Sequence, residues 1–209
     1  MKKIEVFIDG FNLYFGMKDC NATHSYRKTL WFDISSFLHT YLDNAVYCIE
    51  NIYYFTAIPE NNKEKAERHQ IYCKALESTG IKIIYGQYKE KYVNCPLCKQ
   101  DFKSYEEKET DVNVALWILR RGIENGYDKA VLFSGDSDLA PALENAQLLF
   151  PGKIFQVMFP INRNRSKRLK KVCSIAPLYQ YLPCYKKHQF PDKIHLADGT
   201  TLTIPERWK

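Results

Sequence analysis

The chain has 209 residues, of which 45% are hydrophobic and 26% charged, with a formal net charge of +6 at pH 7. This length suits one large domain with a small extension, and the composition supplies enough apolar surface for a core. No run of eighteen apolar residues occurs, so the sequence excludes a membrane-spanning helix and predicts no membrane partner.

Five short apolar runs, each bounded by Gly, Pro or charge, predict buried parallel strands. The first contains Glu5 and ends at Asp9, and these two charges exclude a signal peptide as an interpretation of the N-terminus. The predicted strands cover residues 4–10, 51–58, 81–88, 129–136 and 153–159.

Helical patterns lie between these strands, at 60–80, 110–126 and 137–150. Thr110 is the expected N-cap of the second helix, and Gly126 lies beyond its end. Alternation of strands and helices predicts an α/β fold, a three-layer α/β/α sandwich around a mostly parallel five-stranded sheet of Rossmann-like type.

The last part of the chain has a different pattern, because Asp198 and Gly199 separate two alternating runs and predict a β-hairpin. We therefore expect a sheet domain over residues 1–182 and a hairpin extension over 183–209. A polar insertion at about 89–108 is expected to project as a loop or small ribbon over the site.

Acidic residues follow two of the predicted strands at their carboxyl ends. Asp9 follows the first strand, and Asp136 and Asp138 follow the fourth, with Gly10 and Gly135 allowing sharp turns. Ligands of open parallel sheets bind at this edge. If the two strands are neighbours, the three acids share one crevice.

A fourth acid, Asp111, belongs to the helix predicted at 110–126. Helical spacing places it with Ala115, Ile118 and Gly122, which orients it toward the core. A charge there needs a cation, a donor or a rim of water.

Clustered carboxylates repel one another unless a cation lies between them, and hard divalent ions prefer such oxygen ligands. This chemistry suits hydrolysis of a phosphodiester by an activated water, with Asn12 and Ser134 holding a water or a phosphate oxygen. Each acid also has a simpler interpretation: Asp9 as a turn residue, Asp111 as a partner of the helix dipole, and Asp138 as an N-cap.

Three motifs in order, FIDGFNLY, EKETDVNVAL and SGDSDLAPAL, resemble the NYN domain in its LabA-like (DUF88) branch, within the PIN-like nuclease superfamily. The segment 190–208 is similar to the C-terminal segment of that branch. The resemblance implies an α/β/α sandwich and a metal-dependent ribonuclease that uses Mg²⁺ or Mn²⁺ and leaves a 5′-phosphate.

The resemblance also implies residue roles. Asn12 matches the motif asparagine, Ser134 matches a small polar residue, and Lys108 matches a frequent lysine, whereas Glu109 and Thr110 depart from the family pattern. The implied metal ligands are Asp9, Asp111, Asp136 and Asp138.

The seven cysteines are irregularly spaced, which together with the N-terminus predicts reduced thiols in a cytoplasmic protein. Cys95 and Cys98 form a CxxC pair that can supply half of a zinc site or can simply occupy a tight turn. Aromatic residues around the insertion also suggest a homodimer. The candidates for completing the zinc site are Cys73, Cys173, Cys184, His188 or a second subunit.

Basic residues concentrate after residue 150, where twelve Lys and Arg accompany three Asp and Glu. This asymmetry favours nucleic acid as a partner, although a solvated face is the alternative. The densest run consists of Arg163, Arg165, Lys167, Arg168, Lys170 and Lys171.

The leading hypothesis is a metal-dependent endoribonuclease acting on single-stranded or structured RNA. The alternatives are a non-catalytic RNA-binding regulatory protein and a DNase on the same fold. A phosphotransferase of the haloacid-dehalogenase type is disfavoured, because Phe11 stands where that chemistry needs a second acid.

Overall fold

The structure is a computed structural model and describes residues 1–24, 27–59, 61–176 and 182–209. In this part of the chain a six-stranded sheet has the order β3-β2-β1-β6-β7-β8, and each neighbouring pair is parallel. The strands are β1 (Lys2–Asp9), β2 (Tyr47–Thr56), β3 (Lys82–Tyr85), β6 (Lys129–Phe133), β7 (Ile154–Met158) and β8 (Ser174–Ile175).

The predicted α/β sandwich is confirmed, with one strand more than the five expected. The additional strand, β8, has only two residues, so no apolar run of strand length marks it. The predicted strand 81–88 ends early at Tyr85, where the backbone N–H of Gly86 donates to the carbonyl of Thr56 and the chain then leaves the sheet.

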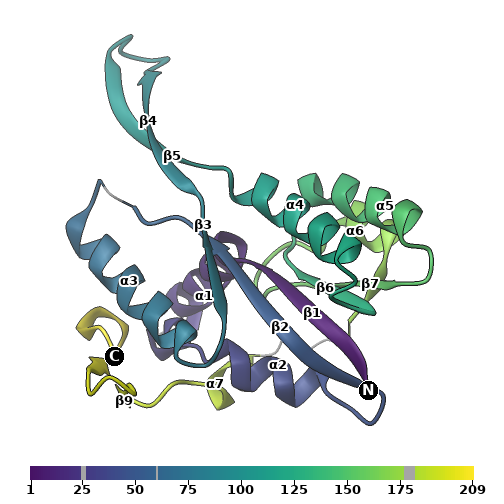
Figure 1. Ribbon diagram of the computed structural model, residues 1–209. Coiled ribbons are helices and arrows are strands. Elements are labelled where there is room, and N and C mark those ends of the chain that lie inside the picture. Colours follow the sequence, from purple (N-terminus) through teal and green to yellow (C-terminus); the bar gives the residue numbers. More distant parts are fainter. Residues whose placement is uncertain (25–26, 60, 177–181) are drawn as a thin grey trace.

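Helices cover both faces of the sheet (Figure 1). Alternate residues of β1 point to opposite sides, so that Val6 and Ile8 join one core cluster while Phe7 joins the other. The first cluster includes side chains of α1 (Gly10–His24), α2 (Ile34–Leu42) and α3 (Lys63–Glu77). The second includes side chains of α4 (Thr110–Ile123), α5 (Ala140–Leu149) and α6 (Lys167–Val172). Shorter helical segments are η1 (Arg27–Leu30), η2 (Ser137–Leu139), α7 (Leu182–Lys187) and η3 (Glu206–Trp208).

The predicted C-terminal hairpin is present as β9 (Lys193–His195) and β10 (Thr201–Thr203), which pair antiparallel. Gly199 has a positive φ of 85°, which glycine adopts without steric cost. The ring of Trp208, beyond the hairpin, is tilted against that of Trp31 with 6.4 Å between the ring centroids, and it belongs to the core cluster that contains side chains of α1 and α3. The C-terminal segment thereby helps to close one face of the sandwich.

The insertion forms a long antiparallel ribbon of β4 (Gln87–Asn94) and β5 (Asp101–Lys108). It leaves the sheet beside β3 and extends away from the body of the molecule (Figure 1). None of the described helices combines the length and apolar character needed to cross a bilayer.

Candidate functional site

The two strands that carry the predicted acids are neighbours, because β1 pairs in parallel with β6 and Ile8 lies opposite Phe133. Asp9 ends β1, and Ser134, Gly135 and Asp136 follow β6 directly. The acids from these two segments therefore meet at the carboxyl edge of the sheet, as the apolar runs predicted.

Hydrogen bonds join the two strand ends through the carboxylate of Asp9. Its Oδ2 accepts from the hydroxyl of Ser134 at 2.8 Å, and its Oδ1 accepts from the backbone N–H of Asn12 at 2.9 Å. Ser134 Oγ accepts in turn from the N–H of Asp136 at 3.0 Å, and Asn12 Oδ1 accepts from the N–H of Gly135 at 3.0 Å. One hydroxyl thus lies within 3.0 Å of both the Asp9 carboxylate and the Asp136 backbone.

Ser134 consequently has a different role from the one expected, and Asn12 has a positioning role that was not expected. Both side chains are buried, and Ser134 is fully so. Their oxygens hold the loop after β6 and the Asp9 carboxylate, so these residues position the acids. Ser134 has no exposed atom with which to hold a water or a phosphate oxygen. Asn12 lines a polar cavity beside Asp136, so for Asn12 that expectation stays a prediction.

The two glycines beside the acids are required for close approach. A Cβ on Gly10 would lie 2.6 Å from the carbonyl oxygen of Phe55, and one on Gly135 would lie 2.9 Å from the carbonyl oxygen of Asn164. Neither glycine has a positive φ, so the expectation that these two positions need glycine for a sharp turn is wrong. Glycine instead lets neighbouring backbone pack against the site.

Asp9 is only 4% exposed, and burial raises its pKa, with the Asn12 and Ser134 hydrogen bonds opposing that rise. The charges of Asp136 and Glu107 raise it further. A carboxylate under this repulsion gains from any cation that reaches it.

Asp111 lies at the exposed start of α4, which corrects the prediction that it points into the core. The buried side of this helix is formed by Thr110, Val114, Ile118 and Gly122, one position away from Asp111. Although water reaches Asp111, surrounding protein displaces enough of it to raise the pKa to about 6, and the negative charges of Asp9 and Asp136 add to the rise. Asp111 therefore belongs to the same electrostatic cluster as the strand-end acids.

Glu107, which sequence reasoning missed, is a further acid at this edge. It lies near the end of β5, and its Oε1 accepts from the N–H of Thr110 at 2.9 Å. The predicted capping of α4 by Thr110 is wrong, because the N-cap is Glu109 with a φ of 76° and the first turn is held by Glu107. No sequence pattern marks an acid at this position, which precedes the N-cap of the helix, as a member of a strand-end cluster.

Asp138 is exposed, and its backbone N–H donates to Asp136 Oδ1 at 2.9 Å. Asp136 is thus the N-cap of η2, and α5 begins after Leu139. The interpretation of Asp138 as a helix cap is therefore wrong. Its carboxylate contributes to the charge that raises the pKa of Asp111.

The acids fit a hard divalent cation in donor type. Among the described residues, no three His, Cys, Asp or Glu side chains lie close enough to hold one metal ion together. Mg²⁺, however, commonly binds one or two carboxylates and keeps several waters. The oxygen donors and their mutual repulsion match that kind of site.

A polar cavity of about 290 Å³ adjoins the Asp136 side of the cluster. Asn12, Asp136 and Arg163 line it, so the basic run does begin at this sheet edge as expected. Arg163 also lies 3.8 Å from Asp19, and Arg168 pairs with Glu144 at 3.3 Å. The remaining residues of the run are exposed: Arg165, Lys167, Lys170 and Lys171.

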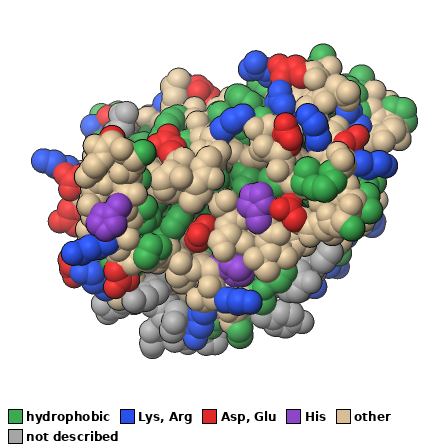
Figure 2. Space-filling model, turned by 60° about the horizontal axis from the view of Figure 1, so that its bottom comes forward, with side chains coloured by type: hydrophobic (Ala, Val, Ile, Leu, Met, Phe, Trp, Pro, Cys, Tyr) green, Lys and Arg blue, Asp and Glu red, His purple; other side chains and the backbone are tan. Residues whose placement is uncertain are grey.

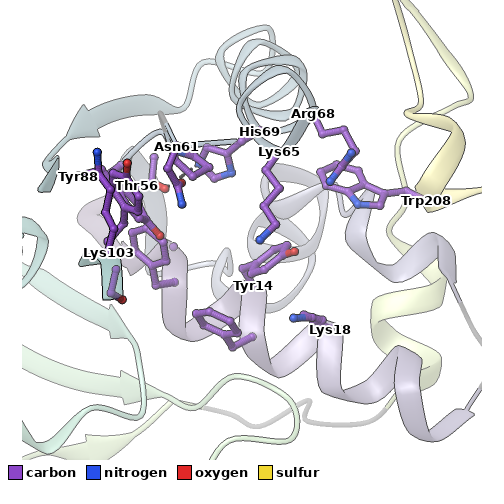
Figure 3. A pocket seen from close by; sticks show the side chains of 17 residues that line it. Tyr14, Lys18, Thr56, Asn61, Lys65, Arg68, His69, Tyr88, Lys103 and Trp208 are labelled. Carbon is purple, nitrogen blue, oxygen red and sulfur yellow. Dashed lines mark hydrogen bonds between the residues drawn. The ribbon is translucent and has the colours of Figure 1, made fainter. Parts of the chain in front are cut away.

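A larger groove of about 460 Å³ begins at Gly10, directly after Asp9, and runs between α1 and α3. Figure 3 shows the side chains of Lys65 and Tyr14 pointing toward one another across it, with Tyr88 of the ribbon at one end and Trp208 at the other. A second cavity that shares Tyr14 and Lys65 continues the groove to Arg207. Sequence reasoning did not identify this groove.

Only cations and neutral groups line this groove within the described part of the chain. Burial lowers the pKa of His69 to about 4, so that its ring is neutral at pH 7. Neither Lys18 nor Lys65 has an acidic partner within 4.0 Å among the described residues. The lining cations are Lys18, Lys65, Arg68 and Lys103, and the rings are those of Phe11, Tyr14, Phe15, Tyr88, Tyr105 and Trp208.

The residues expected to complete a zinc site lie in the body of the molecule, away from Cys95 and Cys98 at the ribbon tip. Cys173 is buried in the second core cluster, and Cys73 is a buried residue of α3. Cys184 belongs to α7. His188 is buried, and its Nδ1 is hydrogen-bonded to the Ser36 hydroxyl at 2.9 Å. The prediction that one of these residues joins the CxxC pair is therefore wrong for the described chain.

Comparison with known proteins found a relative by sequence and a solved structure with a similar fold. The 6-hydroxy-3-succinoylpyridine 3-monooxygenase HspA of Pseudomonas putida (strain DSM 28022 / S16) is 25% identical over 198 residues. That alignment covers 78% of this chain and 62% of the relative. The crystal structure of VPA0982, a protein of unknown function from Vibrio parahaemolyticus RIMD 2210633, superposes with a TM-score of 0.52 at 18% identity, covering 85% of this chain and 92% of that one. The structural likeness supports the fold alone.

A family model, the NYN domain, matches residues 3–177. This range contains β6, α4 and all of β1 except Lys2, and with them every acid of the cluster. The chain therefore belongs to the NYN domain family, within the PIN-like nuclease superfamily.

Proposed function

We propose that the protein hydrolyses phosphodiester bonds of RNA at the cluster formed by Asp9, Asp111, Asp136 and Asp138. The observation that carries this proposal is the hydrogen-bonded joint between Asp9, Ser134 and Asp136. It brings acids from distant segments to one edge, beside a groove lined by cations. Family membership independently supports a nuclease.

A divalent cation, Mg²⁺ or Mn²⁺, is the cofactor that this donor set would hold through one or two of the four aspartates and water. When bound, it would supply a water of lowered pKa and offset charge on the phosphate. Burial raises the pKa of Asp9 and Asp111, and repulsion by the neighbouring acids adds to the rise, so a bound cation would be favoured.

The chain's own residues hold this arrangement in place. Ser134 fixes the Asp9 carboxylate and the Asp136 backbone, while Asn12 fixes the turn at Gly135. In the proposed reaction a water oxygen bonds to phosphorus as the bond to the 3′-oxygen breaks. The products are a 5′-phosphate and, once the 3′-oxygen takes up a proton, a 3′-hydroxyl.

The groove between α1 and α3 is the proposed path of the RNA strand toward the acids. Its lysines and Arg68 can contact phosphates, whose binding to basic side chains is salt-dependent. Its rings offer surfaces on which unpaired bases stack, and each stacked base contributes about 1–3 kcal/mol. Because paired bases cannot use such rings, the groove favours a single strand over a duplex.

A non-catalytic RNA-binding role and a DNase activity are the competing functions. The activity named for the Pseudomonas relative is a monooxygenase, and at 25% identity over part of its length that name is not carried to this chain. A cleavage assay with both RNA and DNA substrates separates the proposed ribonuclease from all of these alternatives.

The experiment incubates the purified chain with labelled single-stranded RNA, duplex RNA and single-stranded DNA, in Mg²⁺, in Mn²⁺ and in EDTA. We expect cleavage of the single-stranded RNA with either ion and none in EDTA. Asp136→Asn should abolish cleavage while RNA binding persists, because the groove is unchanged. Asp198→Asn, in the hairpin turn, is the matched control and should cut at the wild-type rate.

Several results would contradict the proposal. Cleavage by Asp136→Asn at the wild-type rate would remove the acid cluster as the site, and RNA binding without cleavage in any ion would favour the regulatory role. Equal cleavage of DNA would remove the specificity for RNA.

A further inference from the structure

We propose that the tip of the β4–β5 ribbon is half of a tetrahedral zinc site, and that Cys95 and Cys98 of a second copy of this chain complete it. The ribbon lies outside the acid cluster, and this inference does not depend on the proposed nuclease activity.

The turn that joins the two strands is built as a metal-binding knuckle. The N–H of Cys95 donates to the carbonyl of Gln100, and the N–H of Lys99 donates back to the carbonyl of Cys95, both at 2.9 Å. Lys99 has a φ of 59°, which reverses the chain after the second cysteine. Asn94 closes the turn further by donating from Nδ2 to the Lys99 carbonyl at 3.0 Å.

The turn also brings the backbone amides of Leu97 and Cys98 toward the sulfur of Cys95. A thiolate is the form of cysteine that binds zinc, and hydrogen bonds to a ligand atom also fix its orientation.

A single chain cannot supply the other two ligands within its described residues. No group of three metal-binding side chains includes this pair, and Figure 1 shows the ribbon extending away from the body. Structural zinc takes four ligands, with sulfur at about 2.3 Å. Two identical tips that meet about a two-fold axis supply four thiolates with no further residue.

The surface of the ribbon also suits a second copy. Leu97, between the two cysteines, is 91% exposed, and Tyr92 and Phe102 on the adjoining strands are 69% and 51% exposed. The ribbon, residues 87–108, carries five lysines and four acids, so two ribbons bring little net charge together. Cross-strand ion pairs such as Lys91–Glu106 at 3.2 Å already neutralise much of that charge.

The test adds zinc to the reduced, metal-free chain and measures bound metal and molar mass together. We expect one zinc for every two chains and a mass twice the monomer's 24.6 kDa, both reversed by EDTA. Cobalt in place of zinc should give the absorption of a tetrahedral four-thiolate site.

Cys95→Ser and Cys98→Ser should each lose the bound metal and remain monomers. Cys48→Ser, a half-buried thiol in β2, is the matched control and should bind zinc and dimerise as the wild type does. The variants lie at an exposed tip, so unchanged circular dichroism will verify the fold. The proposal is overturned by one zinc per chain in a monomer, by a zinc-bound Cys95→Ser, or by no zinc uptake at micromolar concentrations.

Discussion

At the scale of single residues, the acid cluster depends on Ser134, whose one hydroxyl serves two partners. It donates to Asp9 Oδ2 and accepts from the N–H of Asp136, and it is fully buried. Its side chain is therefore the joint between β1 and the loop after β6.

We predict that Ser134→Ala lowers the free energy of unfolding by about 1–3 kcal/mol, because a buried carboxylate and a backbone amide each lose a partner. Urea unfolding measures this change. Ser137→Ala, at an exposed position two residues beyond Gly135, is the control and should change stability by less than about 0.5 kcal/mol. Equal changes in the free energy of unfolding for the two substitutions would show that the hydrogen bonds of the Ser134 hydroxyl do not stabilise the fold.

The Asp111 carboxyl gives a prediction for pH. Its folded pKa of about 6 exceeds its ordinary value of 3.8, so the folded state binds more protons between these values. Stability therefore falls as pH rises through this window. In EDTA, Asp111→Asn should raise the melting temperature at pH 7.5 and have a smaller effect at pH 4.5. A variant that melts below the wild type at pH 7.5 would contradict the raised pKa of Asp111.

Sequence patterns located four aspartates at this scale because each follows a buried strand or begins a helix. Glu107 escaped prediction, since it belongs to the polar ribbon and reaches the cluster only through the fold. The predicted orientation of Asp111 was wrong by one residue, because the buried side of α4 begins at Thr110.

At the scale of elements, the start of α1 is locked against β2 by the absence of a side chain at Gly10. The neighbours of a Cβ there would be the Phe55 carbonyl oxygen and the Tyr54 ring, both below 3.0 Å. The Phe55 carbonyl is part of the backbone of β2, so it cannot move aside for a new methyl group as the end of a flexible side chain could.

Gly10→Ala should therefore destabilise the protein by about 1–3 kcal/mol through overpacking and should displace Asp9, the preceding residue. Gly152→Ala is the matched control, since a Cβ there meets nothing within 4 Å. Thermal unfolding of both variants gives the comparison. A neutral Gly10→Ala would show that α1 can shift at little cost.

Elements with strong apolar runs were predictable, whereas α1 and α2 were not among the expected helices. The α1 sequence contains two glycines and several aromatic residues, so its local preference for helix is weak. Packing of Leu13 and Met17 into the core stabilises it instead. Such tertiary stabilisation leaves little local signal.

At the scale of the whole molecule, positive charge is divided between a groove and more mixed surfaces. The face in Figure 2 carries basic and acidic side chains interspersed. The groove between α1 and α3 has cations alone among its described charged residues. These groove cations all lie before residue 150, so the net charge of the C-terminal part did not indicate where the groove is.

We predict that Lys18→Ala combined with Lys65→Ala weakens binding of single-stranded RNA and reduces its salt dependence. The slope of log K against log salt should fall in magnitude by about 0.7 for each lost phosphate contact. Fluorescence anisotropy in EDTA at several salt concentrations measures this slope without cleavage. The double variant Lys63→Ala with Lys74→Ala, on the same α3 but outside the groove, should bind as the wild type does. An unchanged slope in the groove variant would place the RNA elsewhere, for example along Arg163–Lys171.

The groove was invisible to sequence reasoning because its walls come from four distant segments. Tyr14 and Lys18 lie one turn apart on α1, as do Lys65 and Arg68 on α3, but no pattern predicts that these two helices face one another. Topology, rather than local sequence, assembles it.

The central claim is that the aspartates that follow β1 and β6, together with Asp111 at the start of α4, attract one divalent cation. Titration of the metal-free chain with Mn²⁺, followed by electron paramagnetic resonance, tests it most directly in wild type, in Asp111→Asn with Asp136→Asn, and in the Asp198→Asn control. The account predicts a Mn²⁺ site in the wild type and the control that is lost or weakened at least tenfold in the double variant. Equal Mn²⁺ binding by all three proteins, or none by the wild type at millimolar Mn²⁺, would contradict it.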